Sequence, residues 1–307
     1  MCLEKIEQLL KIMHIEYSHT ENLRKHTTIH IGGIADYLVY PQCAQEAIDI
    51  FTALHNRNIP CFILGGGSNL LVADKGIRGV VISTKNLNTY SFTSELLTVE
   101  PGALISYISA LSAEHALGGI ESFYSMPGTI GGAVWMNARC YGTEIADLLK
   151  SVQYCDTSGT IHEYSINPKD FAYKDSPFQS KDVLILSCKF RLHYQETASL
   201  WKKMYALRID RIEKGHFAEP SLGSIFKNNR KFKQPTGKIL DKLHVRGMRR
   251  GDAQISRFHA NILVNTGEAL ADDARSIVEL LQQHAFDTFQ IVLEPELLYV
   301  GEWDPRQ

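Results

Sequence analysis

Three consecutive glycines at positions 65–67 directly follow the apolar run 61–64, and they constrain the fold more than any other feature of the sequence. Glycines after a strand let the chain turn sharply and bring successive backbone N–H groups close to an anion. Residues 70–72 continue apolar, whereas a Gly-x-Gly-x-x-Gly dinucleotide fingerprint opens a helix. The pattern therefore predicts a strand–loop–strand unit, and it leaves open both a phosphate-binding loop and a turn without a ligand.

Length and composition indicate a globular chain of two or three domains. The chain has 307 residues, of which 44% are hydrophobic and 21% are charged, and domains usually hold about 100–200 residues. The formal charge of −2 gives no global field that would favour nucleic acid or an anionic membrane. A phosphate group therefore has to be bound by a local feature.

The sequence also argues against membrane insertion, export and metal binding. No apolar run approaches the roughly 20 residues of a membrane-spanning helix, and residues 1–10 do not resemble a signal peptide. We therefore expect a cytoplasmic protein. The six cysteines are scattered without a Cys-x-x-Cys pair, which argues against a zinc site and a disulfide framework.

Apolar spacing predicts mixed helices and strands. Helical spacing covers 44–56 and 105–115, and β-branched alternation over 152–154, 160–164 and 183–192 indicates an antiparallel sheet. A charged helix is expected over 201–213, followed by a polar stretch, 214–223, that is a candidate domain junction. The last part is expected to be α+β. It combines helices at 238–243 and around 274–281 with strands at 260–264 and 291–298.

Four further clusters could carry chemistry. The glycine-rich stretch 126–133 allows a backbone to approach a flat ring such as isoalloxazine, although a turn between core strands explains it equally well. Residues 223–228 present Ser224 after a glycine, with Lys214 upstream. Strand alternation would place Glu294 and Glu296 on one face, where a buried carboxylate needs a partner. Residues 173–176 would ordinarily form an exposed turn.

Taken in order, these segments resemble the UDP-N-acetylenolpyruvoylglucosamine reductase family. The resemblance extends from about residue 22 to residue 301, and the joint order and spacing of the segments carry it. The segments are 26–28, 31–33, 64–70, 127–133, 141–142, 173–176, 223–228, 259–261 and 294–296.

The resemblance implies an α+β fold in three parts. Residues 20–195 would form an FAD-binding domain of the vanillyl-alcohol-oxidase type, with two subdomains divided near residue 82. Residues 196–300 would form a C-terminal substrate domain. The short stretch between residues 176 and 223 resembles the type II branch, which lacks a substrate-covering tyrosine loop.

The resemblance further implies noncovalent FAD, NADPH as co-substrate and a UDP-sugar as substrate. Ser224 would protonate the substrate, Glu296 would bind the enol, and Lys174 would stabilise negative charge. Substrate binding would involve Tyr173, Lys214 and Asn228. The residues implied to bind FAD are Gly65, Gly66, Gly67, Ser68, Asn69, Pro127, Gly128, Thr129, Gly131, Gly132 and Ala133.

The chain departs from the family pattern at several positions. Lys174 stands where arginine is usual, and lysine lacks the planar two-pronged donor set of a guanidinium group. The other departures are Arg139-Cys140 in place of Gly-Ala, Asp252 in place of glycine and Asn229 in place of proline.

Two alternatives stay open at this point. One is an oxidase or dehydrogenase of the same flavin fold that acts on another alcohol or sugar. The set of Ser224, Glu296 and Lys174 argues against it, because an oxidase needs a base and not a proton donor. The other is a flavin- or nucleotide-binding regulatory protein that has lost turnover, which only Lys174 favours.

Overall fold

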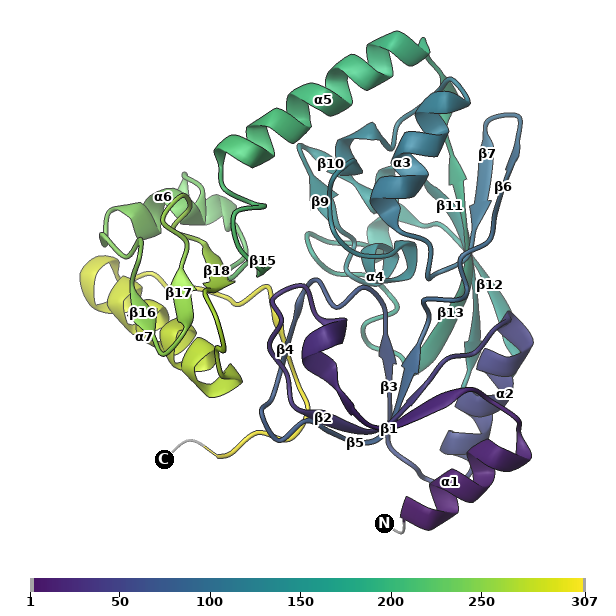
Figure 1. The fold of residues 1–307 in the computed structure, drawn as a ribbon. Coiled ribbons are helices and arrows are strands. Elements are labelled where there is room, and N and C mark those ends of the chain that lie inside the picture. Colours follow the sequence, from purple (N-terminus) through teal and green to yellow (C-terminus); the bar gives the residue numbers. More distant parts are fainter. Residues whose placement is uncertain (1–2, 306–307) are drawn as a thin grey trace. The chain divides into compact units, whose positions relative to one another are not determined.

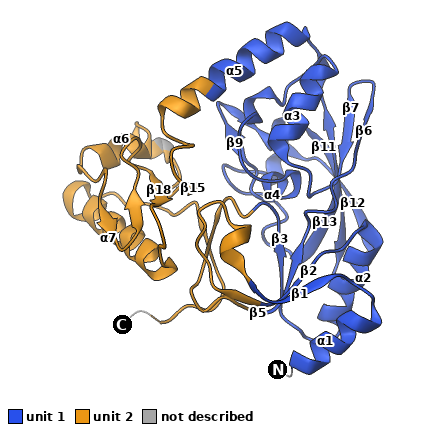
Figure 2. Ribbon diagram, in the orientation of Figure 1, with its two compact units in different colours: residues 1–21, 36–66, 79–208 blue, residues 22–35, 67–78, 209–307 orange. Residues whose placement is uncertain are grey.

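The computed structural model describes residues 3–305, and these residues form two compact units with interleaved sequence segments (Figure 2). Unit 1 comprises Asp36–Gly66, Gly79–Arg208 and the N-terminal segment up to Glu21. Unit 2 comprises Asn22–Ala35, Gly67–Arg78 and the chain from Ile209 onward. The chain therefore passes from one unit to the other inside the glycine loop, between Gly66 and Gly67.

The N-terminal part contains a four-stranded sheet with the order β1-β2-β5-β3 (Figure 1). Its strands are β1 (Tyr17–Asn22), β2 (Ile34–Val39), β3 (Cys61–Leu64) and β5 (Ile77–Ser83), and β3 runs parallel to β5. Helices α1 (Leu3–Ile12) and α2 (Ala44–His55) bury apolar stripes that share one core with Val80 and Ile82 of β5. The helix predicted over 44–56 is confirmed.

A five-stranded sheet with the order β12-β11-β13-β7-β6 forms the rest of unit 1. Its strands are β6 (Tyr90–Thr93), β7 (Leu96–Val99), β11 (Leu149–Asp156), β12 (Ile161–Ser165) and β13 (Val183–Arg191). All neighbouring pairs are antiparallel, as the alternation predicted. Helices α3 (Ile105–Glu114) and α4 (Ile130–Trp135) pack on this sheet through a core that includes Phe123, Phe178 and Phe190.

Short elements complete unit 1 and the N-terminal segment of unit 2. They are η1 (Leu23–His26), β8 (Leu117–Gly118), η2 (Glu121–Phe123), β9 (Arg139–Cys140), β10 (Thr143–Glu144), η3 (Ile145–Asp147), η4 (Pro168–Asp170) and β14 (His193–Tyr194). Only Met136, Asn137 and Ala138 separate the end of α4 from the β9–β10 hairpin.

Helix α5 (Thr197–Glu213) leads into the C-terminal part of unit 2, and the division between the units falls within it, after Arg208. The C-terminal sheet has the order β15-β18-β17-β16, and α7 buries one face against it. The elements are β15 (Ser221–Ser224), η5 (Arg230–Phe232), α6 (Thr236–Asp241), β16 (Arg249–Arg250), β17 (Ala253–Ile255), β18 (Ile262–Asn265) and α7 (Ala271–Phe289). The predicted α+β character is confirmed.

The strand predicted over 291–298 is wrong for most of its length. Residues 290–294 carry no regular structure, and strand β19 (Leu298–Val300) begins only at the end of the predicted range. Strand β19 pairs in parallel with β4 (Leu70–Val72). The physical reason is Pro295, which has no N–H for a ladder and forms only an isolated bridge with Phe226.

Candidate functional site

Two of the glycine-rich segments lie against each other in unit 1. A Cβ atom added to Gly66 would lie 2.7 Å from the Cα atom of Gly128, and one added to Gly65 would lie 2.7 Å from Oγ1 of Thr129. Real Cβ atoms essentially never come so close to a backbone atom, so the contact with Gly128 explains why position 66 carries no side chain. The structure thus brings together the first half of the triple-glycine loop and residues 128–129.

The second half of the loop is held inside unit 2. Gly67 has a positive φ of +60°, and a Cβ atom there would lie 2.0 Å from the carbonyl oxygen of His26. The carbonyl oxygen of Gly67 accepts a hydrogen bond from the N–H of Thr28 at 3.1 Å. The side-chain amide of Asn69 donates to the carbonyl oxygen of Glu296 at 2.9 Å.

The backbone of this loop fits a bound pyrophosphate. Among the described residues, the N–H groups of Gly65, Gly66, Gly67 and Ser68 donate to no backbone or side-chain acceptor. Partly buried N–H groups normally have a partner, and successive free N–H groups on a turn form an anion-binding concavity. The loop thus offers the donors that an FAD pyrophosphate requires.

Backbone conformation and packing explain two of the three glycines in 126–133. Gly128 has a φ of +113°, a region that favours glycine, and a Cβ atom added to Gly131 would lie only 2.6 Å from the side chain of Pro101. An added Cβ atom at Gly132 would have only Oγ1 of Thr129 near it, at 3.5 Å. Gly132 is therefore the glycine whose missing side chain leaves room for a ligand such as a flavin ring.

The same segment is a helix start and not the simple turn that the sequence left open. Thr129 is the N-cap of α4, and its Oγ1 accepts a hydrogen bond from the N–H of Gly132 at 3.4 Å. The N–H groups of Ile130 and Gly131 donate to the carbonyl oxygens of Ala103 and Pro101. These bonds fix the backbone rigidly next to the triple-glycine loop.

Lys174 lies in a tight turn of unit 1. Ala172 and Asp175 exchange two backbone hydrogen bonds, of 3.2 and 3.0 Å, and Lys174 between them has a φ of +60°. Two side chains tie this turn to the C-terminal end of α4. The hydroxyl of Ser176 donates to the carbonyl oxygen of Trp135 at 2.6 Å, and the amide of Gln179 donates to the same oxygen and to that of Lys174.

Ser224 and Glu296 come from neighbouring backbone segments of unit 2. Ser224 is the last residue of β15, and the next carbonyl oxygen, that of Ile225, accepts a hydrogen bond from the N–H of Glu296 at 2.7 Å. Gly223 has a φ of +82°, and an added Cβ atom would find nothing within 4 Å. The serine therefore follows a position that is open to a ligand.

The shared strand face predicted for Glu294 and Glu296 is wrong, because residues 290–294 form no strand. The expectation that at least one of the two carboxylates meets a charged partner is confirmed, since Glu294 pairs with the ammonium of Lys227 at 2.6 Å. The backbone of Glu296 donates to Ile225 and accepts from the side chain of Asn69. The backbone of Glu296 thus lies next to the residue that follows Ser224.

Each of the remaining predicted substrate contacts has a protein partner of its own. The guanidinium carbon of Arg139 lies 5.8 Å from the ring centroid of Tyr173. The ammonium of Lys214 pairs with Asp210 at 2.6 Å. The side-chain oxygen of Asn228 accepts a hydrogen bond from the N–H of Thr236, the first residue of α6.

Two buried asparagines hold the backbone near Ser224 and near Lys174, and the sequence alone did not assign them a role. Asn261 is 2% exposed, and its side chain accepts from the N–H and donates to the carbonyl oxygen of Phe226, at 3.0 and 2.9 Å. Asn137 is fully buried, donates to the carbonyl oxygen of Ala172 at 2.8 Å and accepts from the N–H of Ala146. The signal that could have indicated this role is an asparagine buried within a polar cluster, because buried polar groups normally form hydrogen bonds.

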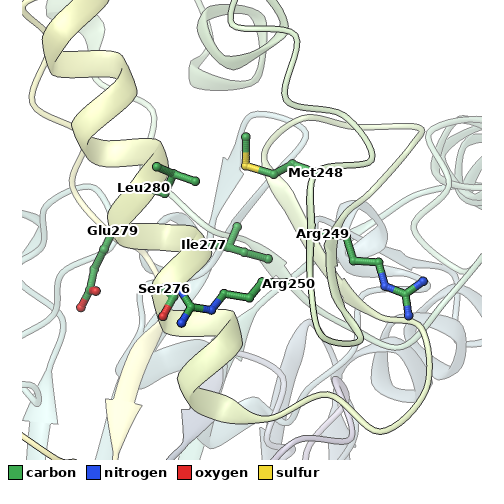
Figure 3. A pocket seen from close by; sticks show the side chains of 7 residues that line it. All are labelled: Met248, Arg249, Arg250, Ser276, Ile277, Glu279 and Leu280. Atoms are coloured by element: carbon green, nitrogen blue, oxygen red, sulfur yellow. The ribbon is translucent and has the colours of Figure 1, made fainter.

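A cavity of about 420 Å³ in unit 2 lies apart from all of these residues (Figure 3). It lies between β16 and α7, and its lining combines apolar side chains of Met248, Ile277 and Leu280 with Arg249, Arg250, Ser276 and Glu279. Arg250 is paired with Asp273, and Arg249 with Asp252. None of the predicted site residues lines this cavity.

Residues 3–305 contain neither a candidate metal site nor a helix that could cross a membrane. No three of their His, Cys, Asp and Glu side chains are grouped so that they could hold a metal ion. No helix among them is long and apolar enough to cross a membrane.

The fold and the glycine segments define an FAD-dependent oxidoreductase. A family model described as FAD binding domain matches residues 35–165, which include the triple-glycine loop and α4. A second model, described as UDP-N-acetylenolpyruvoylglucosamine reductase, C-terminal domain, matches residues 215–300. The expected fold class and the FAD requirement are confirmed.

Relatives extend the match over nearly the whole chain. The UDP-N-acetylenolpyruvoylglucosamine reductase of Borrelia garinii subsp. bavariensis is 38% identical over 283 residues, which is 92% of each protein. That of Treponema denticola is 38% identical over 298 residues, with the same coverage. The crystal structure of the reductase from Thermus caldophilus has a TM-score of 0.77 at 29% identity and covers 93% of this chain. The chain belongs to the UDP-N-acetylenolpyruvoylglucosamine reductase family, as the resemblance implied.

Proposed function

We propose that this protein reduces UDP-N-acetylglucosamine enolpyruvate to UDP-N-acetylmuramate for peptidoglycan synthesis, with NADPH as electron donor and noncovalently bound FAD. The observation that supports the assignment is in unit 2, where the N–H of Glu296 donates to the carbonyl oxygen of Ile225, the residue after Ser224. In this proposal the carboxyl group of Glu296 and the hydroxyl of Ser224 act on the same substrate. An oxidase has no need of a proton donor at this place. The reaction would occur in the cytoplasm, where nucleotide sugars and NADPH are made.

The loop and helix α4 would hold the cofactor. The N–H groups of residues 65–68 would bind the pyrophosphate, and the backbone at Gly132 would lie against the ring system. FAD, when bound, accepts a hydride from NADPH and supplies it to the outer vinyl carbon of the substrate.

Three side chains of this protein would stabilise the charge that develops on the substrate and would transfer the proton. Hydride addition leaves an electron pair that is shared between the inner vinyl carbon and the carboxylate. The ammonium of Lys174 would stabilise this charge, and the carboxyl group of Glu296 would hydrogen-bond to the enol. The hydroxyl of Ser224 would donate its proton to the inner carbon and recover one from water, so that one hydride and one proton are added across the double bond.

Anaerobic half-reactions test this function. The purified protein should be reduced by NADPH, as followed by loss of flavin absorbance, and reoxidised by UDP-N-acetylglucosamine enolpyruvate with formation of UDP-N-acetylmuramate. A protein that is reduced by NADPH but is never reoxidised by this substrate would contradict the proposal and would favour a flavin protein of the same fold with another role.

A further inference from the structure

The β9–β10 hairpin brings a second cation to the turn that contains Lys174. Arg139 of β9 faces Glu144 of β10 in the antiparallel register. Its guanidinium carbon lies 5.8 Å from the ring centroid of Tyr173, the residue that precedes Lys174. All of these residues belong to unit 1. The guanidinium group thus lies against the tyrosine that directly precedes Lys174 in the chain.

The hairpin and the turn form one connected assembly. Asn137, two residues before Arg139, donates to the carbonyl oxygen of Ala172, which is also the acceptor for Asp175 at the base of the turn. The same asparagine donates to the carboxylate of Glu144 at 3.1 Å. Although residues 139 and 174 are far apart in the sequence, these hydrogen bonds therefore fix the hairpin next to the turn.

Three residues of this assembly have a left-handed backbone conformation. Asn137, Tyr141 and Lys174 have φ values of +40°, +47° and +60°, a region that is unfavourable for residues other than glycine. At Gly142, between the hairpin strands, an added Cβ atom would find nothing within 4 Å. Such strain persists where the surrounding structure enforces it, and it is typical of ligand-binding sites.

The guanidinium of Arg139 keeps its donors for a ligand. Its shortest approach to Glu144 is 3.7 Å, which is beyond hydrogen-bond distance. Within the described residues it donates no hydrogen bond to a protein acceptor, and its side chain is about one-third exposed (36%). An arginine has five donors in a planar fork that fits a carboxylate bidentately, whereas lysine provides a point charge.

We propose that Arg139 binds the carboxylate of the enolpyruvyl group and thereby supplies the bidentate contact that Lys174 cannot make. The proposal rests on the proposed function, because the carboxylate is that of its substrate. Arg139 would hold the carboxylate in the ground state, and Lys174 would act on the charge that develops during reduction.

Affinity measurements with three nucleotide sugars test the role of Arg139 without turnover. Arg139→Ala should weaken binding of UDP-N-acetylmuramate and of the enolpyruvyl substrate by roughly tenfold to 100-fold, the effect of a lost charge-assisted contact. Binding of UDP-N-acetylglucosamine, which has no carboxylate, should not change. Arg139→Lys should be intermediate, and Arg57→Ala, at an exposed arginine of the same unit, should bind all three normally.

A double-mutant cycle tests whether the two cations share the carboxylate. Lys174→Arg provides a guanidinium at the turn, so Arg139→Ala should raise KM much less in that background than in the unmodified protein. Lys174→Ala should mainly lower kcat. The rate of flavin reduction by NADPH should change much less than the rate of reoxidation by the enolpyruvyl substrate in every variant, because no substrate carboxylate is present in the first step.

The results for the Arg139 variants and for the unmodified protein distinguish failure of this inference from failure of the proposed function. Equal loss of affinity for all three sugars in Arg139→Ala and Arg139→Lys would show a structural role and overturn the inference. Unchanged affinity for the carboxylate-bearing sugars would overturn it as well. In both cases the unmodified protein still turns over, whereas failure of the unmodified protein to reduce the enolpyruvyl sugar refutes the proposed function itself.

Discussion

At the scale of single residues, Ser224 is the most direct test of the chemistry. Ser224→Ala removes the proposed proton donor and leaves the glycine loop of the cofactor untouched. Flavin reduction by NADPH should be near normal, and reoxidation by the enolpyruvyl substrate should fall by roughly 10²–10⁴-fold, as for a lost general acid. Stopped-flow absorbance separates the two steps. Equal losses in both half-reactions would rule out this role.

The two kinds of glycine near the cofactor give a matched pair of variants. Gly66→Ala places a methyl group against the backbone of Gly128, 2.7 Å away, so we expect the cofactor-free protein to lose about 1–3 kcal/mol of unfolding free energy. Gly132→Ala has room within the chain and lies in a helix, so the cofactor-free protein should keep its stability or gain about 0.5–1 kcal/mol.

FAD titrations distinguish the two variants further. Gly132→Ala should lose FAD affinity although its cofactor-free form is stable, because the methyl group would occupy space proposed for the ring. Denaturation curves of the cofactor-free proteins and fluorescence titrations with FAD give both quantities. Normal FAD binding by Gly132→Ala would contradict the placement of the ring at this position.

At the scale of elements, Asn261 links β18 to the backbone beyond β15. Its side chain makes two buried hydrogen bonds with Phe226, and its carbonyl oxygen accepts from Ile225. Asn261→Ala leaves an N–H and a C=O group of Phe226 unsatisfied, which costs about 1–3 kcal/mol for each group. Urea denaturation should show this loss. Asn261→Asp should lose at least as much at neutral pH, because its buried carboxylate has no donor for the carbonyl oxygen of Phe226, and equal stability of all three proteins would refute the argument.

The loop after α5 contains a histidine that makes stability depend on pH. Burial lowers the pKa of His216 to about 4, and the charges of Arg211, His259 and Lys214 act in the same direction while Asp210 opposes them. The unfolded chain therefore binds more protons than the folded chain between about pH 4 and 6.5, and stability is lost as the pH falls through this window.

The size of this effect can be measured by substitution. His216→Gln should remove roughly 1–3 kcal/mol of the loss in unfolding free energy between pH 7 and pH 4, after allowance for solvent screening. Urea denaturation at a series of pH values gives the slope for each protein. Parallel stability curves for His216→Gln and the unmodified chain would show that this residue does not contribute.

At the scale of the whole molecule, FAD should act as a stabilising ligand. A ligand that binds only the folded state stabilises it by about 2.7 kcal/mol at 100 times its Kd. We expect Tm to rise with FAD concentration, and acid or heat to release the flavin. The control is riboflavin, which lacks the pyrophosphate and should raise Tm much less. Flavin that stays with the denatured chain would contradict noncovalent binding.

The sequence by itself determined the elements with strong periodicity and the family. Helix α2, the antiparallel strands β11, β12 and β13 and the α+β character of the C-terminal part follow from apolar spacing, because burial requires that spacing. The glycine loop excluded a Rossmann helix because residues 70–72 do not open one. The alternation rule failed at Glu294 and Glu296, because it assumes a ladder that Pro295 cannot form.

Only the tertiary structure decided which residues act together. It placed Gly65 and Gly66 against Gly128 and Thr129, it bonded the backbone of Glu296 to Ile225, the residue after Ser224, and it tied the β9–β10 hairpin to the turn of Lys174 through Asn137. These contacts join residues far apart in the sequence, and local propensity carries no information about them. A glycine that avoids a backbone contact and one that leaves room for a ligand look the same in a sequence, because the difference lies entirely in what a Cβ atom would meet.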